Sequence, residues 1–151
     1  MILDVLTAKQ RKRCMSAVRN KNTKPEMAVR KLVHSLGYRY RLHGSGLPGK
    51  PDLILSGRRK LIFVHGCFWH RHCCKKGKSV PSSRGDFWAE KLNSNRVRDK
   101  KNLRKLRKDG WKVLVVWECW TRNPSALKER LIRFLTEDGR EATTLIWNDQ
   151  R

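Results

Sequence analysis

The sequence predicts an α/β fold with a mixed central sheet flanked by helices. Apolar residues recur at helical spacing in several segments, and short runs rich in Val, Leu and Ile separate these segments. The 151 residues contain no internal repeat and no low-complexity linker, so we expect room for one sizeable core. Within the chain, residues 1–20 are expected to form a basic N-terminal arm and residues 21–151 the main domain.

The N-terminal arm contains a predicted basic helix over residues 8–16. Thr7 and Gln10 have the spacing of a capping box at its start. Its apolar content is low, so it is not expected to pack like a core helix. An arm that becomes ordered on DNA is one interpretation, and a frayed surface helix is the other.

A second helix is predicted over residues 23–37. Thr23 can cap it, Glu26 closes the capping box, and Gly37 ends it. Alternation in residues 38–43 then predicts a strand. The apolar face of the helix is expected to consist of Ala28, Val29, Leu32, Val33 and Leu36.

The next elements are predicted to form a β-hairpin. Residues 53–55 make a short apolar strand, residues 57–59 turn the chain, and residues 60–66 make the second strand. The two strands are expected to pair antiparallel with each other.

The second half of the chain predicts a loop, a long helix, a strand and a last helix. Residues 75–86 are the loop, residues 87–110 the helix, and residues 111–119 a buried strand. Asn123 caps the last helix, whereas residues 142–147 give no clear prediction. The core face of the last helix is expected to be Ala126, Leu127, Leu131, Ile132 and Leu135.

Positive charge dominates the composition. Thirty-six Lys and Arg face thirteen Asp and Glu, a formal net charge of +23 that runs from Lys9 to Arg133. Such a surface attracts polyanions, and nucleic acid is the expected partner; a solubility surface or a face for acidic membranes is the alternative. With no run of about 18 apolar residues and no signal-peptide order at the N-terminus, we expect a cytoplasmic protein that does not enter the membrane.

Cysteine usage points to a metal site. The five cysteines lie at positions 14, 67, 73, 74 and 119. An odd, clustered set favours metal ligation in a reducing cytoplasm over disulfides. Cys67, His72 and Cys74 follow the spacing C-x4-H-x-C. With Cys119 they could hold structural zinc, although Cys73 competes with Cys74 and a cluster of free thiols is the alternative.

Asp52 and His65 are expected to meet at one edge of the sheet, because opposite ends of paired antiparallel strands lie side by side. A carboxylate beside an imidazole can bind a hard cation and move protons. An Asp after Pro51 that merely makes a turn is the alternative. The arrangement resembles the restriction-endonuclease core, except that Phe63 and His65 stand where such cores carry an acidic residue and a lysine.

Two aromatic pairs, Phe68-Trp69 and Phe87-Trp88, lie in polar, basic surroundings. Such rings suit stacking on bases or insertion between base pairs, and packing in the core is the alternative. From spacing alone, Glu26 is explained as a helix-capping residue. Asp99 is explained as an ion-pair partner within a helix.

Six motifs in this order resemble the very-short-patch mismatch repair endonuclease (Vsr) family: MSAVRNKNTKPE, LPGKPD, FVHGCFWH, DFWAEK, VRDKKN and VLVVWEC. The resemblance covers about Met15 to Cys119. It implies a restriction-endonuclease-like core with structural zinc. It also implies a Mg²⁺-dependent nick in duplex DNA 5′ of the T in a T·G mismatch, stimulated by a MutL-type protein. The protein would be a monomer associated with the bacterial nucleoid.

The resemblance also assigns a catalytic set. Asp52 matches the metal-binding aspartate, and His65 matches the histidine that replaces the usual lysine. Val64 matches a position that contacts Mg²⁺ by its backbone carbonyl and is often Thr in relatives. His70 and Asp99 match an acid/base histidine and its nearby carboxylate.

Further positions follow from the same resemblance. Glu26 matches a helix glutamate near the active centre. The zinc ligands would be Cys67, His72, Cys74 and Cys119. The DNA-binding positions would be Phe68, Trp69 and Trp88 in an aromatic wedge, Met15 and Val18 in the arm, and Lys91 and Asn95 at base edges. A restriction-type nuclease on unmismatched sites and a non-catalytic zinc-stabilised DNA-binding module are the rival functions.

Overall fold

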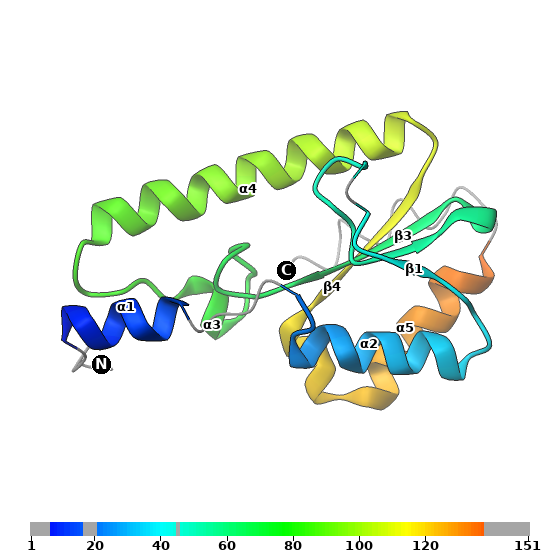
Figure 1. Cartoon of the computed structure of the whole chain (residues 1–151), viewed down its shortest axis with the longest axis horizontal. Helices are drawn as coiled ribbons and strands as arrows, with labels where there is room; N and C mark the ends of the chain where they lie inside the picture. The colour runs from blue at the N-terminus through cyan, green and yellow to red at the C-terminus, as the bar shows by residue number, and fades with distance from the viewer. Residues whose placement is uncertain (1–6, 17–20, 45, 138–151) are drawn as a thin grey trace.

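The computed structural model describes residues 7–16, 21–44 and 46–137 (Figure 1). The strands are β1 (Arg41–Leu42), β2 (Leu53–Leu55), β3 (Lys60–His65) and β4 (Lys112–Trp117). The helices are α1 (Ala8–Ser16), α2 (Lys24–Ser35), α3 (Lys75–Lys78), α4 (Gly85–Lys108) and α5 (Pro124–Thr136), with short 3-10 helices η1 (Ser56–Arg58) and η2 (Glu118–Arg122). Among the described helices, none combines the length and apolar character needed to cross a bilayer.

The strands form the predicted mixed sheet, in the order β1-β2-β3-β4. β2 and β3 pair antiparallel, with Leu53 opposite Ile62, which confirms the hairpin. β1 pairs antiparallel with β2, whereas β3 and β4 run parallel with His65 opposite Trp117. Parallel strands need a long crossover connection, and α4 lies within that connection.

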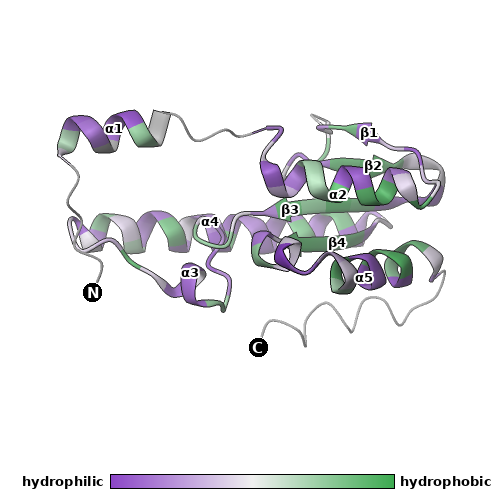
Figure 2. Cartoon of the chain, turned by 90° about the horizontal axis from the view of Figure 1, so that it is seen from below, coloured by the Kyte–Doolittle hydropathy of each residue, from purple (hydrophilic) through white to green (hydrophobic). Residues whose placement is uncertain are grey.

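Helices cover both faces of the sheet. In Figure 1, α4 lies above the sheet and α2 and α5 lie below it. Figure 2 shows that β3 and β4 are largely apolar, whereas the helices carry both polar and apolar residues. Side chains of β3 alternate between the two layers: Ile62 packs with α2 and α5, and Leu61 and Phe63 pack with α4. Burial on both faces explains why β3 and β4 read as continuous apolar runs.

The N-terminal caps predicted at Thr7, Thr23 and Asn123 all form; Asn123 Oδ1 accepts from the Ala126 N–H at 3.2 Å. The Thr7 N–H donates to Gln10 Oε1 at 2.8 Å, and the Gln10 N–H donates to Thr7 Oγ1 at 3.2 Å. Thr23 Oγ1 accepts from the Glu26 N–H at 3.3 Å. The described side chains of α1 are exposed, as expected for a helix outside the core.

Two helix predictions need correction. Ile132 was expected in the core but is 39% exposed, and Phe134 is buried beside Leu131 and Leu135 instead. In a helix that buries Leu127 and Leu131, the next position, 132, points about 100° away from Leu131. Positions 134 and 135 lie on the buried face again. The expected loop 75–86 was also wrong, because it contains α3 and the first residues of α4.

Two strand predictions were too long. The strand expected over residues 38–43 pairs only at Arg41 and Leu42; Tyr38 and Tyr40 pack against the core beside it. The strand expected over residues 111–119 ends at Trp117, where η2 begins. Residues 142–147 lie outside the described part of the chain.

Lys60, at the start of β3, is buried. Its ammonium group donates to the carbonyl oxygens of Phe134 and Leu135, each at 2.9 Å, and of Glu137 at 3.0 Å. The last carbonyls of a helix lack partners within the helix and carry partial negative charge, so a cation is favourable there. Lys60 therefore joins the hairpin to the C-terminal end of α5.

Replacing Lys60 by Met should lower the free energy of unfolding by about 2 kcal/mol or more, because three carbonyls lose a charged donor while the apolar stem is kept. Chemical denaturation of the purified protein measures this. Lys128→Met, on the exposed side of α5, is the control and should change stability by less than about 0.5 kcal/mol. Equal effects of the two substitutions would contradict the role of Lys60.

Candidate active site and metal centre

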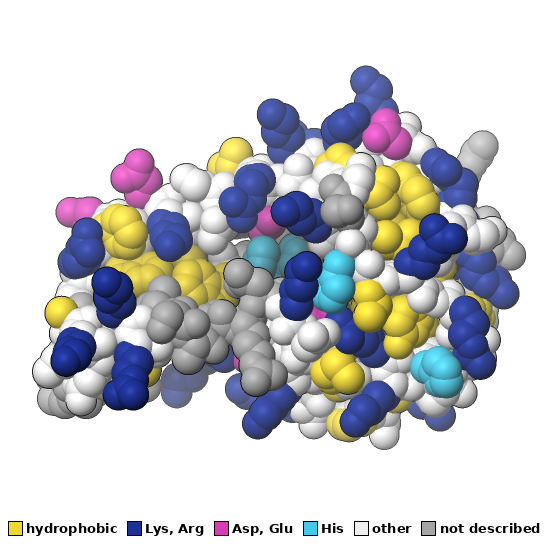
Figure 3. Space-filling model, in the orientation of Figure 1, with side chains coloured by type: hydrophobic (Ala, Val, Ile, Leu, Met, Phe, Trp, Pro, Cys, Tyr) yellow, Lys and Arg dark blue, Asp and Glu magenta, His cyan; other side chains and the backbone are white. Residues whose placement is uncertain are grey.

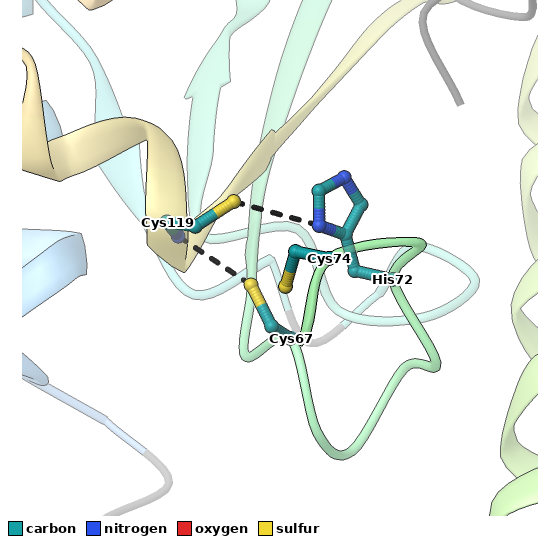
Figure 4. Close-up of side chains that lie close together, drawn as sticks. All are labelled: Cys67, His72, Cys74 and Cys119. Atoms are coloured by element: carbon teal, nitrogen blue, oxygen red, sulfur yellow. Dashed lines mark hydrogen bonds between the residues drawn. The ribbon is translucent and has the colours of Figure 1, made fainter. Parts of the chain in front are cut away.

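The predicted zinc ligands gather at the carboxyl edge of the sheet. Cys67 and Cys119 each lie two residues beyond the paired residues His65 and Trp117, so the parallel pairing of β3 and β4 brings them together. The donor atoms of Cys67, His72, Cys74 and Cys119 all lie within 4.8 Å of one another (Figure 4). Nδ1 of His72 lies 3.5 Å from the Cys119 sulfur, and the Cys119 N–H donates to the Cys67 sulfur at 3.4 Å.

The loop path distinguishes Cys74 from Cys73. Cys74 belongs to the four-residue group, whereas the Cys73 sulfur lies 3.7 Å from Nε2, the other ring nitrogen of His72. Gly77 allows this tight path, because a Cβ at that position would lie 2.0 Å from the His72 carbonyl oxygen. Cys73 is thus on the far side of the imidazole from the cluster.

The chemistry of this cluster fits zinc. Burial raises the pKa of Cys67 to about 12. For Cys74, burial opposes ionisation, but hydrogen bonds from the Gly77 N–H and the Cys67 thiol lower its pKa overall. Three sulfurs and one imidazole nitrogen are a common tetrahedral donor set for structural zinc, and a bound cation would keep the buried thiols ionised.

A second group of residues surrounds a hollow of about 730 Å³ on the other side of the β3 terminus. Its walls include Asp52, Val64, His65, His70 and Asp99. The Val64 N–H donates to the Asp52 carboxylate at 2.7 Å, which fixes the carboxylate against β3. In the space-filling view (Figure 3), histidine side chains are visible in a central hollow with Lys and Arg side chains around it.

His65 and His70 are stacked in this hollow. Their ring centroids are 3.8 Å apart and their planes differ by 8°. Nδ1 of His70 lies 2.5 Å from the Asp99 carboxylate, so Asp99 fixes the orientation of that ring. The sequence alone gave Asp99 only an ion-pair role within its helix; in the structure its partner is His70.

Burial sets the protonation of the central groups. Burial raises the pKa of Asp52 to about 6, against the opposing effect of the Val64 N–H. Burial, followed by the charge of His70, lowers the pKa of His65 well below its usual 6.5. Near neutral pH, His65 is therefore a neutral base and Asp52 is mainly a carboxylate.

Arg30 and His43 belong to this centre and were missed by the sequence analysis. The Glu26 carboxylate contacts the Arg30 guanidinium and lies 3.6 Å from Nε2 of His43. Glu26 was expected to close the capping box with its side chain, but its carboxylate points to Arg30 and His43 instead. The helical spacing of Glu26 and Arg30 indicated an ion pair, but no local pattern placed that pair against His43. In the structure, the His43 N–H donates to the Asp52 carbonyl oxygen at 3.2 Å.

The aromatic residues form one cluster. The ring centroids of Phe68 and Trp69 are 5.1 Å apart, and both lie within 6.0 Å of Trp88. Trp88 is only 9% exposed and supports the other two. The Lys91 ammonium lies 5.8 Å from the centroid of the Trp69 ring, and Asn95 Nδ2 donates to the Trp69 carbonyl oxygen at 3.2 Å.

Comparison with known proteins identifies the family. The family described as "DNA mismatch endonuclease Vsr" matches residues 3–76. The type II nicking enzyme V.XorIIP of Xanthomonas oryzae pv. oryzae is 48% identical over 132 residues, which cover 87% of this chain and 96% of that protein. DNA mismatch endonuclease Vsr of Escherichia coli is 38% identical over 144 residues, covering 92% of each chain. This chain belongs to the Vsr family.

A third relative agrees with this assignment to the Vsr family. The type II nicking enzyme V.NmeAIP of Neisseria meningitidis is 45% identical over 134 residues, which cover 89% of this chain and 95% of that protein. The resemblance inferred from the motifs is therefore confirmed. As a Vsr-family endonuclease the chain acts on DNA, which accounts for its strongly basic composition.

The structure brings most of the Vsr-type site residues into three adjacent groups. These are the cysteine–histidine cluster, the hollow with the histidine pair, and the aromatic cluster. Val18 lies outside the described residues, as does the side chain of Met15, so the expected roles of these two residues stay predictions. Likewise, nothing in the structure tests the expected function of residues 1–20 as a DNA-binding arm.

Replacing Cys119 by Ala should remove bound zinc and lower the free energy of unfolding by several kcal/mol (~3 or more), because a structural zinc site contributes its binding energy to folding. Elemental analysis of the purified protein measures the zinc. Cys73→Ala is the matched control and should keep about one equivalent of zinc. A full zinc equivalent in the Cys119 variant would refute this ligand set.

Proposed function

We propose that this Vsr-family protein nicks one strand of duplex DNA immediately 5′ of the T in a T·G mismatch left by deamination of 5-methylcytosine. Mg²⁺ would be the catalytic cofactor and Zn²⁺ the structural one. One observation carries the proposal: Asp52 shares a hollow with a stacked histidine pair, one member of which is held by its own carboxylate. A DNA-binding module without activity has no need of that arrangement.

Asp52 and Val64 are the residues that would hold Mg²⁺. The Asp52 carboxylate is a hard oxygen donor with a raised pKa that an adjacent cation would lower again. The N–H of Val64 points to Asp52, and in a strand the carbonyl of the same residue faces the same side. Bound there, Mg²⁺ supplies positive charge for the phosphate in the transition state.

The histidines supply proton transfer. Phosphodiester hydrolysis requires removal of a proton from the attacking water and delivery of one to the leaving oxygen. His65 is neutral near pH 7 and can accept a proton. His70 is oriented through Nδ1 by Asp99, which leaves its Nε2 to face the substrate.

The aromatic cluster supports mismatch selection. Phe68 and Trp69 are half-buried on the buried Trp88, so their rings are held in place before DNA arrives. Opening a base step costs a few kcal/mol and less where pairing is already poor, so a rigid wedge favours a mismatch. Lys91 and Asn95, one helical turn apart on α4, flank the wedge and would contact base edges.

The remaining parts of the proposal concern partners. The duplex would be bound by the basic surface and by residues 1–20 as an arm in the opposite groove, with Met15 and Val18 as DNA-binding residues of that arm. The protein would act as a monomer on nucleoid DNA in the cytoplasm, with a MutL-type protein stimulating the repair step.

Asp52→Ala should reduce nicking of a T·G duplex at least about 10³-fold, equivalent to about 4 kcal/mol of transition-state stabilisation, because the metal-binding carboxylate is lost. Binding of the same duplex should be largely kept, since most affinity comes from phosphate contacts. Rates are measured with a labelled duplex and Mg²⁺, and affinities by fluorescence anisotropy. Persistent Mg²⁺-dependent nicking by the variant would refute the assignment of Asp52.

One assay with the wild-type protein separates the rival functions. Duplexes identical except for a T·G or a matched C·G pair are incubated with Mg²⁺. The proposed function gives nicks only in the mismatched duplex. Cleavage of both duplexes would indicate a restriction-type nuclease, and binding without cleavage would indicate a non-catalytic module.

Trp69→Ala should bind matched duplex about as well as wild type but lose preference for the mismatch by roughly tenfold or more, because the wedge no longer exploits weak pairing. Competition binding between T·G and matched duplexes measures this ratio. Ile132→Ala, an exposed apolar residue on α5, serves as the control and should leave the ratio unchanged. Unaltered discrimination in the Trp69 variant would exclude the wedge role.

A further inference from the structure

The Arg30 guanidinium contacts two of three groups that could otherwise hold a metal ion. Glu26, His43 and Asp52 each offer one donor atom, and these atoms lie within 4.8 Å of one another. Nη2 of Arg30 donates to Glu26 Oε1 and lies 3.1 Å from Nε2 of His43. A cation belonging to the protein thus occupies the place where a metal bound by Glu26 and His43 would sit.

This cation is held rigidly. Arg30 is 8% exposed, and its Nη1 contacts the Met27 sulfur at 3.4 Å. The Tyr40 hydroxyl donates to the Arg30 carbonyl oxygen at 3.2 Å, which anchors the backbone beneath the side chain. Because a guanidinium stays charged at any physiological pH, its positive charge does not depend on an ion supplied from solution.

Burying this arginine costs free energy, so its position is not explained by a contribution to stability. Within the described residues, Arg30 Nε is a buried side-chain nitrogen without a hydrogen-bond partner. A buried ion pair of this kind is often less stabilising than apolar side chains of similar volume. A functional role accounts for the presence of this charge in the protein, because it acts on the Asp52 carboxylate.

We propose that Arg30 is the fixed cation of the active centre and takes the place of a second divalent ion. It neutralises Glu26, orients His43 and leaves Asp52 with Val64 as the position for a single Mg²⁺. A second divalent ion between Glu26, His43 and Asp52 would lie within contact distance of the guanidinium and be repelled by it. This inference rests on the proposed function only for the identity of the catalytic metal. Arg30 acts here as a positioning residue.

The test counts divalent ions in the zinc-loaded protein. Calorimetric titration with Ca²⁺, a hard cation that does not favour thiolate sites, is carried out on wild type and on Asp52→Ala. The difference between the two gives the ions bound at the active centre. We expect wild type to bind about one Ca²⁺ ion more than Asp52→Ala does. Binding of about two more ions would overturn the proposal.

Variants of Arg30 then test the charge itself. Arg30→Met keeps the stem without the charge and should gain a second Ca²⁺ at the centre; its nicking rate should depend more steeply on Mg²⁺ concentration. Arg30→Lys keeps the charge and should bind like wild type. Lys31→Met, exposed on the same helix, is the matched control.

An unchanged ion count and Mg²⁺ dependence in a folded Arg30→Met variant would overturn the proposal. If that variant does not fold, the wild-type ion count and the behaviour of Arg30→Lys decide: a second ion in either one overturns it. The outcome is separate from that of the proposed function. A wild-type protein that binds a single ion but does not nick T·G duplexes would refute the proposed function and support the role of Arg30.

Discussion

The parallel pairing of β3 with β4 is the constraint on which the other functional features depend. It places His65 opposite Trp117, so the residues that follow each strand emerge side by side at one edge. Cys67 and Cys119 meet there although they are far apart in the sequence. A slip of one residue would turn every side chain of β4 to the opposite face of the sheet and remove Trp117 from beside His65.

Trp117 connects the metal centre to the histidine pair. Its ring lies 5.5 Å from His65 and stacks on His72 at 4.4 Å. The segment HGCFWHRHCC, residues 65–74, therefore serves three groups at once: His65 and His70 face the hollow, Cys67, His72 and Cys74 join the cluster, and Phe68 and Trp69 join the aromatic rings. A metal bound by the cysteine–histidine cluster would fix the distances among these groups.

Local patterns in the sequence were sufficient for much of the fold. The hairpin and the capped helices were predicted because each depends on residues close in sequence. The mixed sheet was predicted from the order of helices and strands along the chain, and the cysteine and histidine spacing predicted a metal cluster. Ile132 was wrongly expected in the core and Phe134 was omitted from it, because the rotation of a helix against its sheet depends on tertiary packing.

Arg30 and His43 were missed for a related reason: their importance lies in the approach of α2 to the end of β1, which no local pattern reports. The choice between Cys73 and Cys74 likewise depended on the path of a loop rather than on spacing.

The three hydrogen bonds of Lys60 also bear on how the chain folds as it leaves the ribosome. Lys60 is separated from its acceptors by 74 to 77 residues, so the hairpin is synthesised long before the end of α5. Until residue 137 has emerged, the ammonium group cannot be buried with its partners, and it stays in water. A chain that ends before α5 would leave the ammonium group without these three acceptors, and the core on that side of the sheet would lack Leu127, Leu131 and Leu135.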